Sequence, residues 1–208
     1  MRNRTEKGIK VSGTDKTIMY YNKYAREFAA GTIGADFRSI QDLFADRLPK
    51  GAHILDFGCG AGRDARYFRE RGFQVEAIDG SKELCSIASK YSGVPVKQKL
   101  FQDLDETECY DGIWACASIL HVPSAHLKSL FRKMIKALKK HGILYVSFKY
   151  GNFEGERNGR YFTDMTEERF AKFLADIEEL QQEEQWVTSD VRPERGNEKW
   201  LNLILRKQ

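Results

Sequence analysis

The sequence predicts an α/β fold built around a doubly wound, seven-stranded, mostly parallel sheet. The first observation behind this prediction is an alternation of patterns. Short apolar runs, typical of buried strands, alternate with amphipathic runs of about ten or more residues, typical of helices. The second observation is that this alternation stops after residue 148, where two closely spaced strand-like runs indicate an antiparallel edge strand pair.

Each element follows from its own local pattern. Strands are predicted for residues 53–57, 74–78, 94–99, 111–115, 142–148, 185–187 and 200–205. Helices are predicted for residues 61–71, 81–91, 124–140 and 166–175. Ser81 and Ser124 are expected to cap two of these helices, because a serine hydroxyl accepts a hydrogen bond from the first helical turn. Residues 150–160 are polar and rich in glycine, and no strand or helix is predicted there.

The composition of the chain excludes several classes of protein. No apolar run in the 208 residues approaches the length of a membrane span, which is about 20 residues. The N-terminus lacks the apolar stretch of a secretory signal, so we expect a cytoplasmic protein. The four cysteines form no CxxC pair and no zinc spacing, so reduced thiols and no metal site are expected. We expect one domain at 17–208 after a flexible segment at 1–16, as a monomer or homodimer.

The net charge of +4 is mild, but the basic residues are unevenly distributed. Between Asp111 and Glu154 the chain has seven Lys or Arg and no carboxylate. One interpretation is a nucleic-acid-binding face on the basic 128–140 helix. The other is the solvated side of an amphipathic helix, whose apolar residues recur at helical spacing between the lysines. We favour the second interpretation, which makes a nucleic-acid partner unlikely.

The most informative stretch is the glycine-rich run that follows the strand at 53–57. Its glycines stand between a predicted strand and a predicted helix, where the backbone can come close to a ligand. Asp79 ends the next strand, which places its carboxylate at the same sheet edge, where a ribose diol can be held. The pattern D-x-G-x-G-x-G, with Asp56 in front, favours S-adenosylmethionine (SAM), whose cationic sulfonium and ammonium suit a carboxylate. The alternative is a dinucleotide, because the run GAGRDA fits a looser NAD fingerprint.

At this point the chain resembles the class I SAM-dependent methyltransferases, over about residues 20–207. The run LDFGCGAGRD looks like their first motif, VEAIDGS like the second, and YDGIWACASILHV like the segment around the fourth strand. The Cys-Gly-x-Gly-Arg-Asp run is most similar to the tellurite-resistance-type methyltransferases. The resemblance implies a Rossmann-like methyltransferase fold with an N-terminal helical lid at 17–48. It also implies SAM as the cofactor and S-adenosylhomocysteine as the product.

The resemblance also implies a set of cofactor-binding positions around the loop, the strand ends and the lid. Asp79 is expected to hold the ribose hydroxyls, Arg63 to pair with the cofactor carboxylate, and Phe101 and Gln102 to border the adenine. The family often has an acidic residue before Phe101, but Leu100 stands here. The full set is Tyr21, Asp56, Gly58, Cys59, Gly60, Gly62, Arg63, Asp79, Gly80, Phe101, Gln102, Cys116 and Ala117.

The methyl acceptor is predicted to bind beside the cofactor, above the later strands. His121 is the candidate general base, because its ordinary pKa of ~6.5 suits proton transfer; the other interpretation is a packing role at a turn. Cationic and aromatic residues indicate an anionic small-molecule acceptor, although they also fit ordinary surface charge. These residues are Lys149, Tyr150, Arg160, Arg192 and Trp200.

Three other functions remain open at this stage. An RNA methyltransferase would use the basic 128–140 helix and bind RNA in a salt-dependent way. An NAD-dependent oxidoreductase would need the dinucleotide fingerprint and Asp79. A cofactor sensor without catalytic activity would keep the fold and lose only the reaction.

Overall fold

The computed structural model describes residues 13–192 and 195–208. Its main sheet has seven strands in the order β3-β2-β1-β4-β5-β9-β8. The strands are β1 (His53–Phe57), β2 (Gln74–Asp79), β3 (Val96–Gln98), β4 (Tyr110–Ala115), β5 (Leu138–Lys149), β8 (Leu180–Ser189) and β9 (Lys199–Lys207). β1 to β5 are parallel, and β9 runs antiparallel to both β5 and β8. This confirms the predicted doubly wound sheet with an antiparallel pair at one edge.

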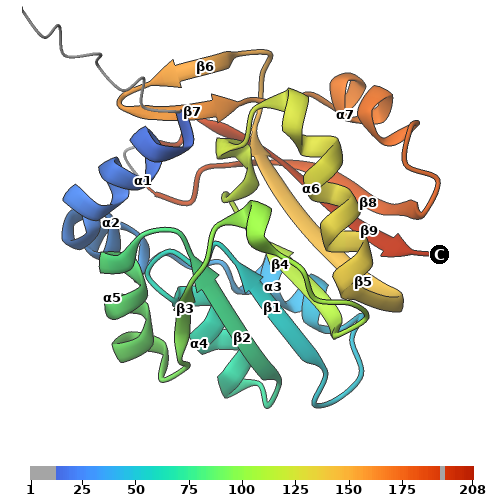
Figure 1. Cartoon of the computed structure of the whole chain (residues 1–208), viewed down its shortest axis with the longest axis horizontal. Coiled ribbons are helices and arrows are strands. Elements are labelled where there is room, and N and C mark those ends of the chain that lie inside the picture. The colour runs from blue at the N-terminus through green and yellow to red at the C-terminus, as the bar shows by residue number, and fades with distance from the viewer. Residues whose placement is uncertain (1–12, 193–194) are drawn as a thin grey trace, which may run out of the picture.

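Helices cover both faces of this sheet (Figure 1). α3 (Arg38–Ala45), α4 (Arg63–Glu70) and α5 (Lys82–Ser92) pack on one face, and α6 (Ser124–Ala137) and α7 (Glu167–Leu174) pack on the other. The side chains of a strand point alternately to the two faces. In β4, Ile113 therefore joins the cluster under α6 and α7, and its neighbour Trp114 joins the cluster under α3 and α4.

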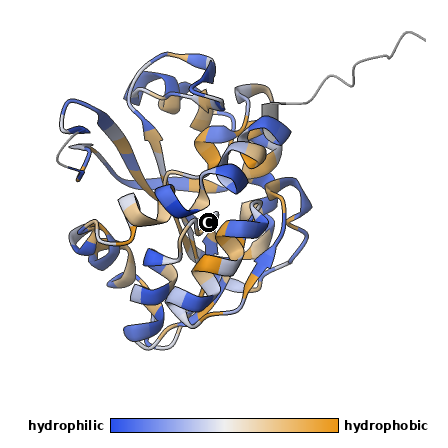
Figure 2. Ribbon diagram, turned by 90° about the vertical axis from the view of Figure 1, so that its left-hand side faces the viewer, coloured by the Kyte–Doolittle hydropathy of each residue, from blue (hydrophilic) through white to orange (hydrophobic). Residues whose placement is uncertain are grey.

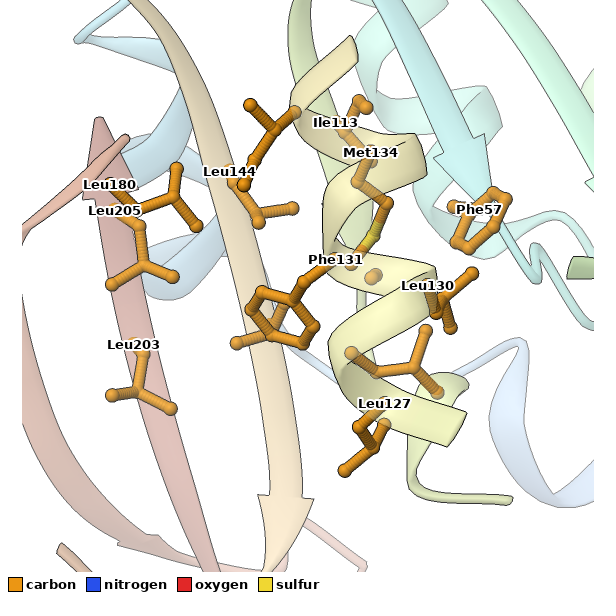
Figure 3. Close-up of a cluster of buried hydrophobic side chains, with 14 of the residues drawn as sticks. Phe57, Ile113, Leu127, Leu130, Phe131, Met134, Leu144, Leu180, Leu203 and Leu205 are labelled. Atoms are coloured by element: carbon orange, nitrogen blue, oxygen red, sulfur yellow. The ribbon is translucent and has the colours of Figure 1, made fainter. Parts of the chain in front are cut away.

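The cluster under α6 is the larger part of the core (Figure 3). One apolar side of α6, with Phe131 and Met134, contacts residues of β4, β5 and β9. The helices carry hydrophilic as well as hydrophobic residues (Figure 2), as amphipathic helices on a sheet do. Burial of these apolar side chains holds the strand ends, and therefore the residues that follow them, in place.

Two details of the predicted helices are wrong. α6 ends at Ala137 rather than at 140, because Leu138 is extended, fully buried and paired with Tyr110 in the sheet. Ser124 does not cap α6: its own backbone N–H donates to the Glu154 carboxylate at 2.9 Å, and no side chain caps this helix. The Ser81 cap of α5 is confirmed, since its hydroxyl accepts from the Leu84 N–H at 3.2 Å.

The polar segment at 150–160 contains structure that the sequence analysis missed. β6 (Glu154–Arg157) and β7 (Arg160–Thr163) form a separate two-stranded antiparallel sheet. Asn158 and Gly159, which join them, both have positive φ angles, of 52° and 77°. An Asn-Gly pair is a strong sequence signal for a two-residue hairpin turn, so this hairpin was detectable.

The N-terminal helix α1 (Gly13–Lys23) lies beside this hairpin (Figure 1), and α2 (Ala25–Thr32) lies beside α5. The Tyr161 N–H donates to the Thr17 hydroxyl at 3.0 Å, and the Lys16 ammonium pairs with Glu156 at 2.7 Å. Of the predicted flexible segment 1–16, residues 1–12 lie outside the described residues and residues 13–16 belong to α1. Within the described part of the chain, no helix is both long enough and apolar enough to cross a membrane.

Candidate active site

One cavity of about 530 Å³ lies at the carboxyl ends of the parallel strands. Its cofactor half consists of residues that directly follow β1, β2, β3 and β4: Gly58, Cys59, Gly60, Arg63, Asp79, Gly80, Phe101, Gln102, Cys116 and Ala117. Its acceptor half comes from later and more distant segments: His121, Lys149, Arg160, Phe162, Arg192 and Trp200. Tyr21, on α1, lines the cavity as well.

The glycine loop at residues 58–62 forms a cradle, in which side chains added at the glycines would collide with neighbouring residues. Gly58 and Gly60 have positive φ angles of 87° and 54°. A Cβ on Gly58 would stand 2.5 Å from the Ser118 Cβ, and one on Gly60 would stand 3.1 Å from the Phe28 ring. Gly62 differs, because its missing Cβ would meet the Ala88 backbone at 3.0 Å, and it does not line the cavity. Gly62 therefore serves the packing of α4 on α5, whereas Gly58 and Gly60 let Ser118 and Phe28 pack close to the loop at the cavity wall.

Asp79 is held at the cavity wall by two backbone groups. Its Oδ2 accepts from the Gly60 N–H at 2.9 Å, and its Oδ1 accepts from the Ser81 N–H at 2.8 Å. Burial raises the pKa of this carboxyl to about 6, although these two hydrogen bonds act in the opposite direction. Each oxygen keeps a second lone pair, so the carboxylate can still accept two hydroxyl groups of a ribose.

Asp56 is placed differently from the sequence expectation. It is 2% exposed, lies behind the glycine loop and does not line the cavity. Its Oδ2 has no hydrogen-bond partner, and burial, together with nearby Asp64, raises its pKa well above the ordinary value. A buried, unpartnered carboxyl oxygen beside a glycine cradle is a position where an ammonium group or a water molecule is favourable.

Arg63 is held by a network that the sequence analysis missed. Its guanidinium donates to both oxygens of Asp64, at 2.8 and 2.9 Å, and stacks on the Phe37 ring at 4.5 Å. Asp64 also accepts from the Gln41 amide at 2.6 Å and from the Trp114 indole at 2.9 Å. Burial acts to raise the pKa of Asp64, but the Arg63 guanidinium brings it below the ordinary value. This ion pair fixes the cation at the wall of the cofactor half.

Aromatic and small residues complete the cofactor half. Phe101, in the short helix η1 (Phe101–Asp103), lies 4.7 Å from the Phe57 ring, measured between ring centroids. Ala117 has a positive φ of 50° and donates its N–H to the Ser147 hydroxyl at 2.8 Å. Gln102 and Cys116 line the same wall. The structure thus brings together all predicted cofactor positions at the cavity except Asp56 and Gly62.

The acceptor half is organised around His121, in the short helix η2 (Ile119–His121). The His121 Nδ1 lies 2.6 Å from the Tyr161 carbonyl oxygen, and its Nε2 lies 2.8 Å from the Tyr21 hydroxyl. A carbonyl oxygen only accepts, so Nδ1 carries the proton and Nε2 accepts from the Tyr21 hydroxyl. Burial, with Arg160 nearby, lowers the pKa of His121 to about 4, so the ring is neutral at physiological pH.

The cations of the acceptor half differ in whether the protein neutralises them. Lys149 pairs with Glu198, and Arg192 donates to both oxygens of Asp190. The Trp200 indole N–H also donates to Asp190, at 3.1 Å. Arg160 has no carboxylate partner among residues 13–192 and 195–208, and its Nε is buried without a hydrogen-bond partner. Its guanidinium lies 4.5 Å from the Tyr20 ring and donates to the Tyr21 hydroxyl at 3.3 Å.

Tyr150 is the one predicted acceptor residue that the structure does not bring to the cavity. It is 39% exposed, and its hydroxyl donates to Glu167 on α7 at 2.7 Å. The sequence analysis placed it there because it directly follows β5. However, Tyr150 forms a bridge with Met165 instead of continuing toward the cavity.

The basic stretch does not form one continuous helical face. Its C-terminal residues Lys139 and Lys140 belong to β5, and Lys139 pairs with Asp111 at 2.9 Å. On α6, Lys128 pairs with Asp176 at 3.0 Å, and Lys133 donates to the Leu104 carbonyl at 3.1 Å. These partners support the interpretation of a solvated helix side. Within the described ranges, no cluster of His, Cys, Asp and Glu could hold a metal ion.

Comparison with solved structures shows the same fold. The magnesium protoporphyrin IX methyltransferase of Synechocystis, solved with bound SAM, matches with a TM-score of 0.75 at 16% identity, over 98% of this chain and 100% of that one. The 1,6-didemethyltoxoflavin-N1-methyltransferase of Burkholderia thailandensis matches with a TM-score of 0.73 at 21% identity, over 92% and 85%. A TehB-like SAM-dependent methyltransferase from Corynebacterium glutamicum matches with a TM-score of 0.66 at 19% identity, over 91% and 97%.

Sequence comparison points the same way. An uncharacterized methyltransferase of Staphylococcus carnosus is 24% identical over 177 residues, which cover 77% of this chain and 84% of that protein. The ubiquinone biosynthesis O-methyltransferase of Xanthomonas axonopodis pv. citri is 33% identical over 106 residues, which cover 48% and 44%. At this level of identity, the chain spans about half the length of the curated relatives that it matches. The family model described as a methyltransferase domain matches residues 21–182, and the chain therefore belongs to this methyltransferase family.

Proposed function

We propose that this methyltransferase transfers the methyl group of SAM to a small-molecule acceptor that carries an anionic group. The observation that carries the proposal is Arg160, a guanidinium in the cavity wall without a carboxylate partner in the described part of the chain. A small acceptor is supported by the size of the cavity, about 530 Å³, which suits a cofactor and a compact second ligand. The match to a methyltransferase family speaks against the NAD-dependent alternative.

The residues of the cofactor half fit SAM. Asp79 would hold the ribose hydroxyls, and Phe101 would border the adenine. The part of the cavity that Gly58 and Gly60 line would admit the methionine part. Its carboxylate would accept from the Arg63 Nη1, since Asp64 accepts from Nε and Nη2. When bound, SAM supplies an activated methyl group and a neutral leaving group, so the protein has only to align the acceptor and exclude water.

The argument for an anionic acceptor rests on a contrast between three cations. Lys149 and Arg192 are each neutralised by a carboxylate of the protein, and they line the cavity as ion pairs. Within the described residues, the Arg160 guanidinium contacts aromatic rings and a hydroxyl and no carboxylate. A partly buried charge without a counter-ion is unfavourable, so an anionic ligand would gain a charge-assisted hydrogen bond there.

His121 is the proposed proton acceptor for the reaction. The Tyr161 carbonyl fixes the proton on Nδ1, so Nε2 is the hydrogen-bond acceptor of the ring, and a hydroxyl of the acceptor would bind there in place of the Tyr21 hydroxyl. The cytoplasmic location and the monomeric or homodimeric state are predictions from the sequence.

Calorimetric titration and a matched pair of variants test the proposal. We expect micromolar binding of S-adenosylhomocysteine and no binding of NAD. We expect Arg160→Gln to keep this affinity and to raise the KM for an anionic acceptor about tenfold or more, because a charge-assisted hydrogen bond is lost. Arg132→Gln, at an exposed position of α6, is the control. Binding of NAD in place of S-adenosylhomocysteine would refute the cofactor, and an unchanged KM in Arg160→Gln would refute the anionic acceptor.

A further inference from the structure

The acceptor half already holds a phenol, and that phenol belongs to the protein. The Tyr21 hydroxyl lies 2.8 Å from the His121 Nε2 and 3.3 Å from an Nη atom of Arg160. Tyr21 comes from α1, His121 from η2 and Arg160 from β7, so three separate segments meet at this oxygen. The contact is therefore a property of the assembled cavity and not of a local turn.

The two partners of this oxygen have fixed and opposite hydrogen-bonding roles. Since the His121 Nδ1–H donates to the Tyr161 carbonyl, Nε2 can only accept. The Arg160 guanidinium can only donate. A ligand atom that satisfies both must donate one hydrogen bond and accept another, which is what a hydroxyl group does. A carboxylate or a phosphate has no proton for Nε2, although it can accept from the other N–H groups of the Arg160 guanidinium, and an ammonium has no lone pair for Arg160.

The acidity that the hydroxyl needs restricts the class of ligand further. His121 is a weak base, since burial and the nearby Arg160 lower its pKa to about 4. An aliphatic hydroxyl resembles water, with a pKa of about 15.7, whereas a phenol has a pKa of about 10. At this position, burial raises the pKa of the Tyr21 phenol, although the Arg160 guanidinium acts in the opposite direction. Such a weak base can take a proton only from an acidic hydroxyl.

The walls around this point suit an aromatic ring. The Phe162 ring lies 4.9 Å from the His121 ring and 5.1 Å from the Arg160 guanidinium. Trp200 lines the same half, with the Lys149 ammonium 5.6 Å from its ring. Flat apolar surfaces with a few polar groups favour planar ligands.

We propose that the methyl acceptor is a phenol or an enol whose hydroxyl takes the place of the Tyr21 hydroxyl between His121 Nε2 and Arg160. This inference rests on the proposed function and names the acceptor class of the same site. The hydroxyl proton passes to Nε2, while the oxygen forms a bond to the methyl carbon. The bond from that carbon to sulfur breaks, and its electron pair stays on sulfur as a neutral thioether. The imidazolium then releases the proton to solvent. In the absence of acceptor, Tyr21 occupies the position.

Binding of matched small probes to the protein saturated with S-adenosylhomocysteine tests this. The probes are 4-nitrophenol and 4-hydroxybenzoate, each compared with the same compound lacking the hydroxyl, nitrobenzene and benzoate. The absorption of 4-nitrophenol reports both its binding and its ionisation. We expect the two phenols to bind at least tenfold more tightly than their matched compounds. We also expect methylation of a phenol when SAM replaces the product.

Two variants separate the hydroxyl site from general cavity effects. His121→Asn keeps an N–H for the Tyr161 carbonyl and removes the Nε2 acceptor, so phenol binding should weaken about tenfold while benzoate binding stays unchanged. Tyr21→Phe removes the competing hydroxyl, so phenol binding should tighten several-fold. An unchanged midpoint of thermal unfolding shows that each variant is folded.

Some outcomes would overturn this proposal, and a different one would overturn the proposed function. Equal binding of phenols and their matched compounds, unchanged phenol binding in His121→Asn, or weaker phenol binding in Tyr21→Phe would each overturn the proposal. Failure of the wild-type protein to bind S-adenosylhomocysteine would instead overturn the proposed function itself. The two failures are therefore distinguishable.

Discussion

The two halves of the cavity are built in different ways. In the cofactor half, each residue directly follows a parallel strand, and the glycine loop is a contiguous run from β1 into α4. In the acceptor half, the contact between Tyr21 and His121 joins residues 100 positions apart, and that between Tyr21 and Arg160 joins residues 139 positions apart. The cofactor half is therefore a product of local sequence at strand ends, whereas the acceptor half depends on how lid, hairpin and sheet edge meet.

The largest expected effect comes from filling the glycine cradle. Gly58→Ala places a Cβ 2.5 Å from the Ser118 Cβ at a φ of 87°. Overpacking and backbone strain together should cost about 3 kcal/mol of folding free energy unless the loop shifts. The shifted loop should lower the affinity for S-adenosylhomocysteine, measured by calorimetry, about a hundredfold, because a displacement of about 1 Å in a site can cost that much. Gly31→Ala, where a Cβ would meet nothing within 4 Å, is the control. Equal affinities in the two variants would mean that the loop is not part of the cofactor half.

The next effect concerns Asp79, whose carboxylate is proposed to hold the ribose hydroxyls. Asp79→Ala should weaken binding of S-adenosylhomocysteine by about 2 kcal/mol, or about thirtyfold, because two charge-assisted hydrogen bonds are lost. Calorimetric titration measures this, with Asp46→Ala, whose side chain is 70% exposed, as the control. Unchanged affinity in Asp79→Ala would refute the ribose role.

A smaller effect should report on binding of the methionine end of the cofactor. Arg63→Gln should weaken S-adenosylhomocysteine about tenfold, because a charged hydrogen bond to its carboxylate contributes about 1.5 kcal/mol. The affinity for 5′-methylthioadenosine, which lacks the amino-acid end, should stay the same. A parallel loss for both ligands would mean that breaking the Arg63–Asp64 pair has disturbed the whole cavity.

The pH dependence of binding should also differ between the two halves. Asp79 has a pKa of about 6, so its ionised fraction, and with it the affinity for a ribose diol, rises as the pH rises. Between pH 5 and pH 7 that fraction grows about tenfold, which sets the largest expected gain in affinity. His121, with a pKa of about 4, stays neutral over this range and contributes none of it. Titrations of wild type and Asp79→Asn at both pH values check this, and a gain that persists in Asp79→Asn would contradict it.

Most of the fold was predictable because its signals are local. Periodicity located the sheet and its helices, and only element ends were displaced, as at Leu138, where pairing with Tyr110 outweighed helix formation. The hairpin of β6 and β7 was missed although Asn158-Gly159 marks its turn. The support of Asp64 by Gln41 and Trp114 was not predictable, because these two partners come from α3 and β4.

The sequence by itself determined the sheet, the glycine cradle and the position of Asp79, because strand ends and tight turns are set by neighbouring residues. Only the tertiary structure decided which cation of the acceptor half lacks a partner and which oxygen His121 faces. The cations Lys149, Arg160 and Arg192 look alike in the sequence. The physical reason for their difference is that Glu198 and Asp190 reach two of them, whereas in the described part of the chain α1 brings a hydroxyl and aromatic rings to Arg160 and no carboxylate.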